Sequence, residues 1–259
     1  MKTAIKLVLI YFAMQIIGVF VVGPLARGYA YIEYGSVERA GELAAAPILL
    51  AGIILMSIYL WKQGYLTNDK RLYSFVSASY LFWSAIMGIS MIYLVDYLMS
   101  HLSFLPDWYE NTFDILQSGW LVIACLAVLG PILEELLFRG AITKVLLKKY
   151  NPLTAILVSG LIFGIFHVNP AQVVGATLIG FILAWIYYRT RSLIPCILIH
   201  IMNNSLSVYL SLKFPDVDSC SELIGENAYL IGLIVAVVLL LLSWRMMNTY
   251  KLSNTTTEI

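Results

Sequence analysis

Charged residues are scarce in this chain. Of its 259 residues only 12% are Asp, Glu, Lys or Arg, whereas 61% are hydrophobic, and the mean hydropathy is +0.86. A soluble domain carries about 25% charged and about 45–50% apolar residues. The composition therefore excludes an ordinary soluble domain and predicts an all-α, polytopic membrane protein. The net charge of +1 provides no basic surface, so no nucleic-acid partner is expected.

Cysteine and histidine are also sparse. Cys125, Cys196 and Cys220 are far apart in the sequence and form no CxxC pair, which argues against a zinc knuckle or a redox pair. The three histidines include no HExxH, so the usual zinc-protease signature is missing. An internal repeat and a low-complexity linker are lacking as well. We therefore expect one integral-membrane domain over residues 1–259.

Against this background, eight apolar segments are long enough to cross a bilayer or nearly so. Their approximate limits are 5–22, 45–61, 73–99, 120 to about 134, 153–167, 173–188, 193–212 and 229–247. The first segment ends at Gly23-Pro24 and not at a small-residue cleavage site, so it is predicted to be a retained helix and not a signal peptide.

The charges between these segments are unevenly distributed. If the segments alternate in direction, thirteen of the sixteen Lys and Arg residues fall on the side of the N-terminus. Cytoplasmic loops carry an excess of Lys and Arg. The pattern predicts eight spans in the cell membrane with both termini in the cytoplasm, and its longest outer loops at residues 27–42 and 101–118.

Polar side chains interrupt the fourth segment, where a charge costs about 2.5–3.5 kcal/mol on insertion scales. Glu135 and Arg139 are four residues apart in the order that favours a helical ion pair, which leaves Glu134 to face elsewhere. Pro131 removes a backbone donor just before the acids and is expected to bend the helix. The alternative is a structural ion pair near the cytoplasmic end, with Glu134 reaching towards the interface.

Two further polar groups lie in the fifth and seventh segments. Phe163 and His167 share one helix face, as do His200 and Asn204, whereas Asn203 is expected to point away towards a neighbouring helix. Gly160 and Gly164 form a small-xxx-small pattern that lets another helix approach closely. The alternatives are a structural role for His167 and an interhelical hydrogen bond for Asn204.

The depths of these groups are compatible with one polar cavity enclosed by the helices. At 1.5 Å per residue, His200 lies roughly 11 Å into its segment and His167 roughly 20 Å into its own. If the fourth helix continues to about Lys148, Glu134 lies well inside the bilayer. The depth of His167 is the weakest match.

Together, the three groups resemble the EExxxR, FxxxH and HxxxN motifs of the CAAX-processing and bacteriocin-processing (CPBP, or Abi) family of intramembrane glutamic proteases. The motifs are complete and in order between residues 130 and 204, which would be the catalytic core. The resemblance implies that Glu134, assisted by His167, activates water, and that His200 and Asn204 stabilise the oxyanion. It implies a supporting role for Glu135, Arg139 and Phe163, and neither metal nor cofactor.

Other functions are open at this point. Glu134, His167 and His200 are a possible zinc ligand set, and Cys196 precedes His200 by four residues as a possible Cys-His pair. A non-catalytic scaffold, a bacteriocin self-immunity protein and a transporter are further alternatives, although the missing repeat disfavours a transporter. Eukaryotic members of the family trim prenylated C-terminal tails, and prokaryotic members act on other peptides. The expected partners are the bilayer and a peptide or protein reached from the membrane or the cytoplasm.

Overall fold

The computed structural model describes residues 1–67, 69–108, 119–217 and 219–250, which form helices and no strands. Seven helical stretches are long and apolar enough to cross a membrane, and the apolar helix α9 is shorter. The elements are α1 (Lys2–Ile17), η1 (Gly18–Val22), α2 (Gly23–Tyr34), α3 (Val37–Lys62), η2 (Lys70–Tyr73), α4 (Ala78–Ser100), α6 (Trp120–Ala124), η4 (Cys125–Leu129), α7 (Gly130–Leu137), η5 (Phe138–Thr143), α8 (Lys144–Leu147), α9 (Pro152–Phe166), α10 (Pro170–Thr190), α11 (Ile194–Lys213), α12 (Cys220–Ile224) and α13 (Glu226–Thr249).

The all-α membrane fold predicted from the composition is confirmed. Each of the eight predicted segments corresponds to one helical stretch, with α9 as the fifth. The fourth is continuous from Trp120 to Leu147, as its extension towards Lys148 predicted. The outer loop predicted at 101–118 lies partly outside the described residues, which resume at Gly119.

The prediction that the first helix ends at Gly23-Pro24 is wrong. The helical stretch runs from Lys2 to Tyr34, so the predicted outer loop at 27–42 is reduced to Gly35 and Ser36. Gly35 adopts a left-handed conformation with φ of 67°, which ends α2. Ser36 then accepts a hydrogen bond from the Arg39 amide and so caps α3.

The reason for this difference is a wide turn in front of each Gly-Pro pair. Proline has no amide hydrogen and its ring collides with the carbonyl four residues earlier. Before Pro24 the turn Gly18–Val22 is π-helical, and the Gly23 amide bonds to the carbonyl of Gly18. The same arrangement precedes Pro131, where the Gly130 amide bonds to the carbonyl of Cys125. One extra residue per turn lets both helices continue through proline.

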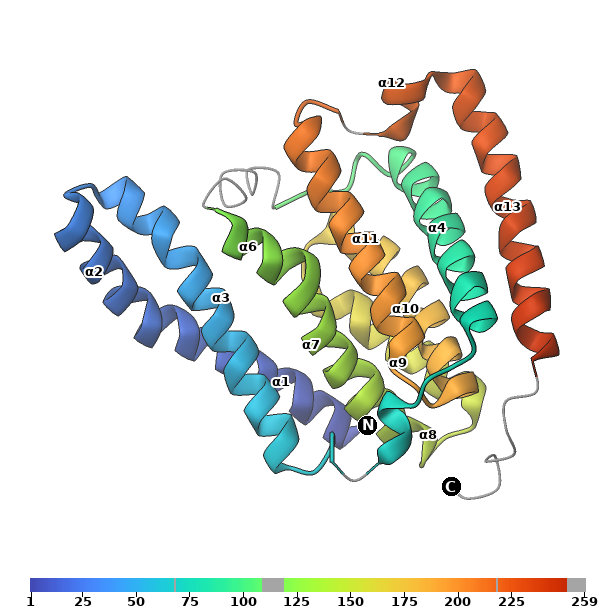
Figure 1. Cartoon of the computed structure of the whole chain (residues 1–259), viewed down its shortest axis with the longest axis horizontal. Coiled ribbons are helices and arrows are strands. Elements are labelled where there is room, and N and C mark those ends of the chain that lie inside the picture. Colours follow the sequence, from blue (N-terminus) through green and yellow to red (C-terminus); the bar gives the residue numbers. More distant parts are fainter. Residues whose placement is uncertain (68, 109–118, 218, 251–259) are drawn as a thin grey trace.

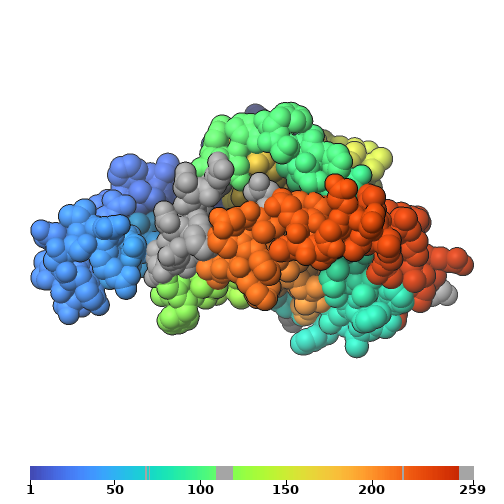
Figure 2. All heavy atoms as spheres, turned by 90° about the horizontal axis from the view of Figure 1, so that it is seen from above, coloured from blue at the N-terminus to red at the C-terminus, as the bar shows by residue number. Residues whose placement is uncertain are grey.

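The helices form an elongated bundle in which α2 and α3 make one end and α13 makes the other (Figures 1 and 2). Figure 1 shows α7 and α11 side by side in the middle, with α9 and α10 behind them. Helices α9 and α10 approach closely because glycine faces glycine: a Cβ added to Gly180 would meet the Cα of Gly160 at 3.0 Å. The close approach predicted from Gly160 and Gly164 is confirmed.

Candidate active site

The centre of the polar region is a fully buried ion pair. Arg139 Nη1 donates to Glu135 Oε1 at 2.7 Å, and both side chains have an exposed fraction of 0%. The ion pair predicted from the four-residue spacing is therefore confirmed. A buried charge of this kind needs further partners to offset its loss of hydration.

Arg139 obtains these partners from the two neighbouring helices α9 and α10. Its Nη2 donates to the carbonyl of Gly180 at 3.2 Å. Its guanidinium also lies 4.4 Å from the ring centroid of Phe163, a cation–π distance. Arg139 thus ties α9 and α10 to its own helix, and Phe163 forms one wall of the charged cluster.

His200 joins the same carboxylate from α11. Its Nδ1 lies 2.7 Å from Glu135 Oε1, the oxygen that also accepts from Arg139. Because an ionised carboxylate only accepts hydrogen bonds, Nδ1 is the donor. The other ring nitrogen, Nε2, faces Glu134 Oε2 at 3.7 Å. Glu135 therefore fixes the His200 ring as well as the Arg139 side chain. Its contact with His200 joins two helices and follows from no spacing in the sequence.

His167 also packs against Phe163. The Phe163 ring is 4.9 Å from the imidazole of His167 and 5.6 Å from that of His200, both edge to face. Both imidazoles therefore contact the same phenyl ring. Within the described structure His167 and Glu134 are not hydrogen-bonded to each other.

The orientation of His167 follows from the end of α9. Its backbone amide bonds to Gly164, which leaves the carbonyl of Phe163 free to accept from His167 Nδ1 at 2.8 Å. Since a carbonyl only accepts, Nδ1 carries the proton in this bond and Nε2 of the neutral ring is left with a lone pair.

Asn204 is held by hydrogen bonds at both ends of its carboxamide. Its Nδ2 donates to the carbonyl of Leu126 at 3.1 Å. That carbonyl has no backbone donor within its helix, because the Gly130 amide bonds to Cys125 and Pro131 has no amide hydrogen. The interhelical bond considered for Asn204 is thus present, and the second hydrogen of Nδ2 is available for another acceptor.

The prediction for Asn203 is wrong. Its Nδ2 donates to the Oδ1 of Asn204 at 3.1 Å instead of reaching a neighbouring helix. The bond orients the Asn204 amide, so that its NH2 group points at Leu126. Helical spacing alone places these two side chains about 100° apart, but carboxamides are long enough to meet beside the helix.

Exposure divides the cluster into two layers. Glu135, Arg139, Phe163 and His200 are buried. Glu134, with 18% of its side chain exposed, is only partly buried, and so are His167 and Asn204. His200 connects the two layers, because its Nδ1 is bonded to the buried Glu135 and its Nε2 faces the partly exposed Glu134.

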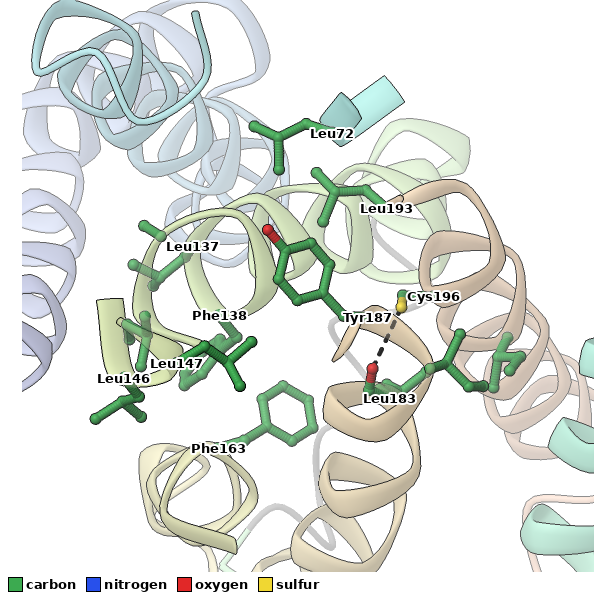
Figure 3. Close-up of a cluster of buried hydrophobic side chains, with 14 of the residues drawn as sticks. Leu72, Leu137, Phe138, Leu146, Leu147, Phe163, Leu183, Tyr187, Leu193 and Cys196 are labelled. Atoms are coloured by element: carbon green, nitrogen blue, oxygen red, sulfur yellow. Dashed lines mark hydrogen bonds between the residues drawn. The ribbon is translucent and has the colours of Figure 1, made fainter. Parts of the chain in front are cut away.

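The thiol of Cys196 is directed away from His200. It is fully buried and donates to the carbonyl of Leu183 at 3.3 Å (Figure 3). The Nδ1 of His200 is already bonded to Glu135. The Cys-His pair considered from the sequence is therefore not formed. Among the residues that the structure describes, no three His, Cys, Asp or Glu side chains are grouped to hold a metal ion.

Comparisons with known proteins point to the same region. Residues 116–206 match the family described as "Type II CAAX prenyl endopeptidase Rce1-like". The chain is 37% identical over 107 residues to the "Putative membrane peptidase YdiL" of Bacillus subtilis, which covers 40% of this chain and 44% of that protein. It is 28% identical over 159 residues to "UPF0177 protein YxdF" of Lactococcus lactis, which covers 57% of this chain and 85% of that protein. No solved structure matches the chain.

The matched residues contain all three motifs, from Glu134 to Asn204. The chain spans less than half the length of the Bacillus relative, and the first three helical spans lie outside the family match. The resemblance predicted from the motifs is confirmed: this multi-pass membrane protein is related, through residues 116–206, to the CPBP family of CAAX-processing membrane peptidases.

Proposed function

We propose that this chain is an intramembrane endopeptidase that hydrolyses a peptide bond with a water molecule activated by Glu134 and His167. The observation that carries the proposal is the state of the two adjacent carboxylates. Oε2 has no hydrogen-bond partner among the described residues in either acid, but Glu135 is buried with its Oε1 bonded to Arg139 and His200, whereas Glu134 is partly exposed. Glu134 is thus the acid of the pair that is free to accept a proton from water.

In the proposed reaction, water attacks the carbonyl carbon of the scissile bond and gives one proton to Glu134. The lone pair on His167 Nε2 accepts a hydrogen bond from the same water and orients it. The tetrahedral intermediate then collapses, the carbon–nitrogen bond breaks, and Glu134 passes its proton to the leaving nitrogen. Oxygen and hydrogen of the water end in the new carboxyl and amino groups.

The negative oxygen of the intermediate needs hydrogen-bond donors fixed in advance, which typically contribute about 10²–10³-fold in rate. The free Nδ2 hydrogen of Asn204 is one. His200 Nε2 is the second when both ring nitrogens carry a proton. With Glu134 and Glu135 ionised, the charges of Arg139 and a protonated His200 balance them, which lowers the cost of burying the cluster.

We also propose that both termini face the cytoplasm and that the substrate is a peptide or protein segment reached from the membrane or the cytoplasmic side. The excess of Lys and Arg on one side of the spans supports this orientation. The start of α1 and the end of α13 both lie on the lower side of the bundle in Figure 1, which supports two termini on the same side of the membrane.

The test compares the membrane peptides of cells that carry the native chain, Glu134→Gln or the exposed control Glu226→Gln. Fragments that depend on the native chain and on Glu226→Gln, but vanish with Glu134→Gln, support a peptidase. If Glu134→Gln complements a deletion strain fully and changes no fragment, the chain acts as a scaffold or immunity protein. Cleavage that a strong chelator abolishes would refute the metal-independent mechanism.

A further inference from the structure

The turn that follows His167 is anchored by a buried side chain that the reaction above does not use. Asn169 has an exposed fraction of 0%, although it lies at the start of α10. Asparagine at such a position usually caps its own helix. Here the side chain makes no capping bond. The carboxamide is therefore engaged elsewhere.

Its partners lie in the segment that follows α4. Asn169 Nδ2 donates to Asp107 Oδ1 at 2.8 Å, and Asn169 Oδ1 accepts from the Trp108 amide at 3.1 Å. A third bond runs beside them, from the amide of Ala171 to the carbonyl of Pro106 at 3.3 Å. Three hydrogen bonds thus join 106–108 to the first residues of α10.

The backbone between His167 and Asn169 needs such an anchor. Val168 has a φ of 61°, in the left-handed region that a β-branched residue rarely adopts. The Val168 side chain is about half exposed and packs too little to hold that conformation by itself. The Asn169 amide bonds back to the carbonyl of His167 at 2.6 Å, which closes the turn directly on the histidine. A strained residue of this kind persists only where its surroundings hold it.

We propose that Asn169 is a positioning residue for His167: its buried carboxamide fixes the strained turn at the end of α9 and so keeps the His167 imidazole bonded to the Phe163 carbonyl and aimed at the site. The importance of this for turnover rests on the function proposed above. The effect on the imidazole does not, and is measured separately.

The measurement uses the small number of histidines. The chain has only His101, His167 and His200, so ¹⁵N-histidine labelling in detergent gives three imidazoles, assigned with His→Gln variants. At about pH 8.5, two units above the usual histidine pKa of about 6.5, the native His167 should carry its proton on Nδ1. His101 is an internal reference, since its Nδ1 also lies 2.9 Å from a carbonyl four residues earlier, that of Tyr97, without an asparagine clamp.

Asn169→Ala should shift His167 towards the Nε2-protonated tautomer while His101 and His200 keep their signals. The matched control is Asn151→Ala, which removes the asparagine cap at the start of α9, the helix that ends just before His167. It should leave all three imidazoles unchanged. Unchanged His167 signals in folded Asn169→Ala would refute the proposal. On any substrate found for the native chain, Asn169→Ala should lower kcat about tenfold to a hundredfold with little change in KM.

An exchange of partners covers the case in which Asn169→Ala disturbs all three histidines. Asn169→Asp removes the donor and sets two carboxylates against each other. The double change Asn169→Asp with Asp107→Asn reverses the donor and keeps an acceptor for the Trp108 amide. The double variant should recover the native His167 signals that the single Asn169→Asp loses. If it does not, the carboxamide bond does not position His167.

Discussion

Replacing each of the two adjacent glutamates with glutamine should separate catalysis from stability. Glu135 Oε1 holds Arg139 and His200 at 2.7 Å each, and these three side chains have exposed fractions of 0% to 4%. Glu134 Oε2 has no hydrogen-bond partner among the described residues and lies 3.7 Å from His200 Nε2. The two side chains differ by one position in the sequence and by their whole environment in the fold.

Glu135→Gln should destabilise the protein strongly. Removing one partner of a buried ion pair costs about 3–5 kcal/mol, because the other charge is left uncompensated. The lower end applies here, since the glutamine oxygen still accepts one hydrogen bond. A loss of about 3 kcal/mol lowers the ratio of folded to unfolded protein about a hundredfold. Glu134→Gln should change stability by less than about 0.5 kcal/mol but lower kcat about 10²–10⁴-fold.

The assay is unfolding in mixed micelles with increasing sodium dodecyl sulfate, followed by circular dichroism, beside cleavage of a substrate identified from the membrane peptides. Glu226→Gln, an exposed residue at the start of α13, controls for the loss of a carboxylate. Equal unfolding midpoints for the native chain and Glu135→Gln would refute the argument from the buried pair. Native turnover in Glu134→Gln would refute its role as the base.

Three further changes test separate contacts. Asn204→Ala leaves the Leu126 carbonyl without a donor and should lower the free energy of unfolding by about 1–2 kcal/mol in the same assay. It should also reduce kcat more than it changes KM. A variant as stable as the native chain would show that this hydrogen bond does not stabilise the fold. Gly164→Ala drives a methyl group into the threonine hydroxyl of α10 and should cost about 1–3 kcal/mol, which Gly28→Ala, in open space, should not. Partial burial raises the pKa of the Asp69 carboxyl, but its bonds to Lys144 and to a backbone amide outweigh this and hold the pKa below its usual value. The resulting stabilisation is complete above about pH 4 and disappears as the pH falls through the lowered pKa. Asp69→Asn should therefore lower the free energy of unfolding by about 0.5–1 kcal/mol at pH 7 and leave it unchanged in acid. A loss of stability that is the same at both pH values would contradict this.

Features encoded within one helix could be predicted from the sequence. Hydropathy gives the eight segments, because the bilayer demands a length and an apolar composition. The four-residue spacing gives the Glu135–Arg139 pair, because such residues are neighbours on a helix. The resemblance to the three family motifs identifies the remaining candidate site residues, although it says nothing about the distances between them.

Features that depend on the rotation and tilt of two helices could not be predicted in this way. The bond from Glu135 to His200 joins residues 65 positions apart, and no spacing rule relates them. The acceptor of Asn204 is a backbone carbonyl, which is present at every position and leaves no mark in the sequence. Pro131 gives a partial signal, since a proline lacks the amide that would bond a carbonyl four residues earlier, and the π-helical turn moves the free carbonyl to Leu126. A π-helical turn before Pro24, like the one before Pro131, lets the first helix continue beyond residue 23.

The shared oxygen of Glu135 also constrains how the protein is assembled during synthesis. The helical stretch Trp120–Leu147 enters the membrane with Glu134, Glu135 and Arg139, while α10 and α11, which supply the Gly180 carbonyl and His200, are made later. Until these arrive, the charged helix lacks most of its partners and its stay in lipid is costly. Correct docking of α11 removes that cost. The polar cluster therefore favours the complete bundle over any chain that ends before its seventh span.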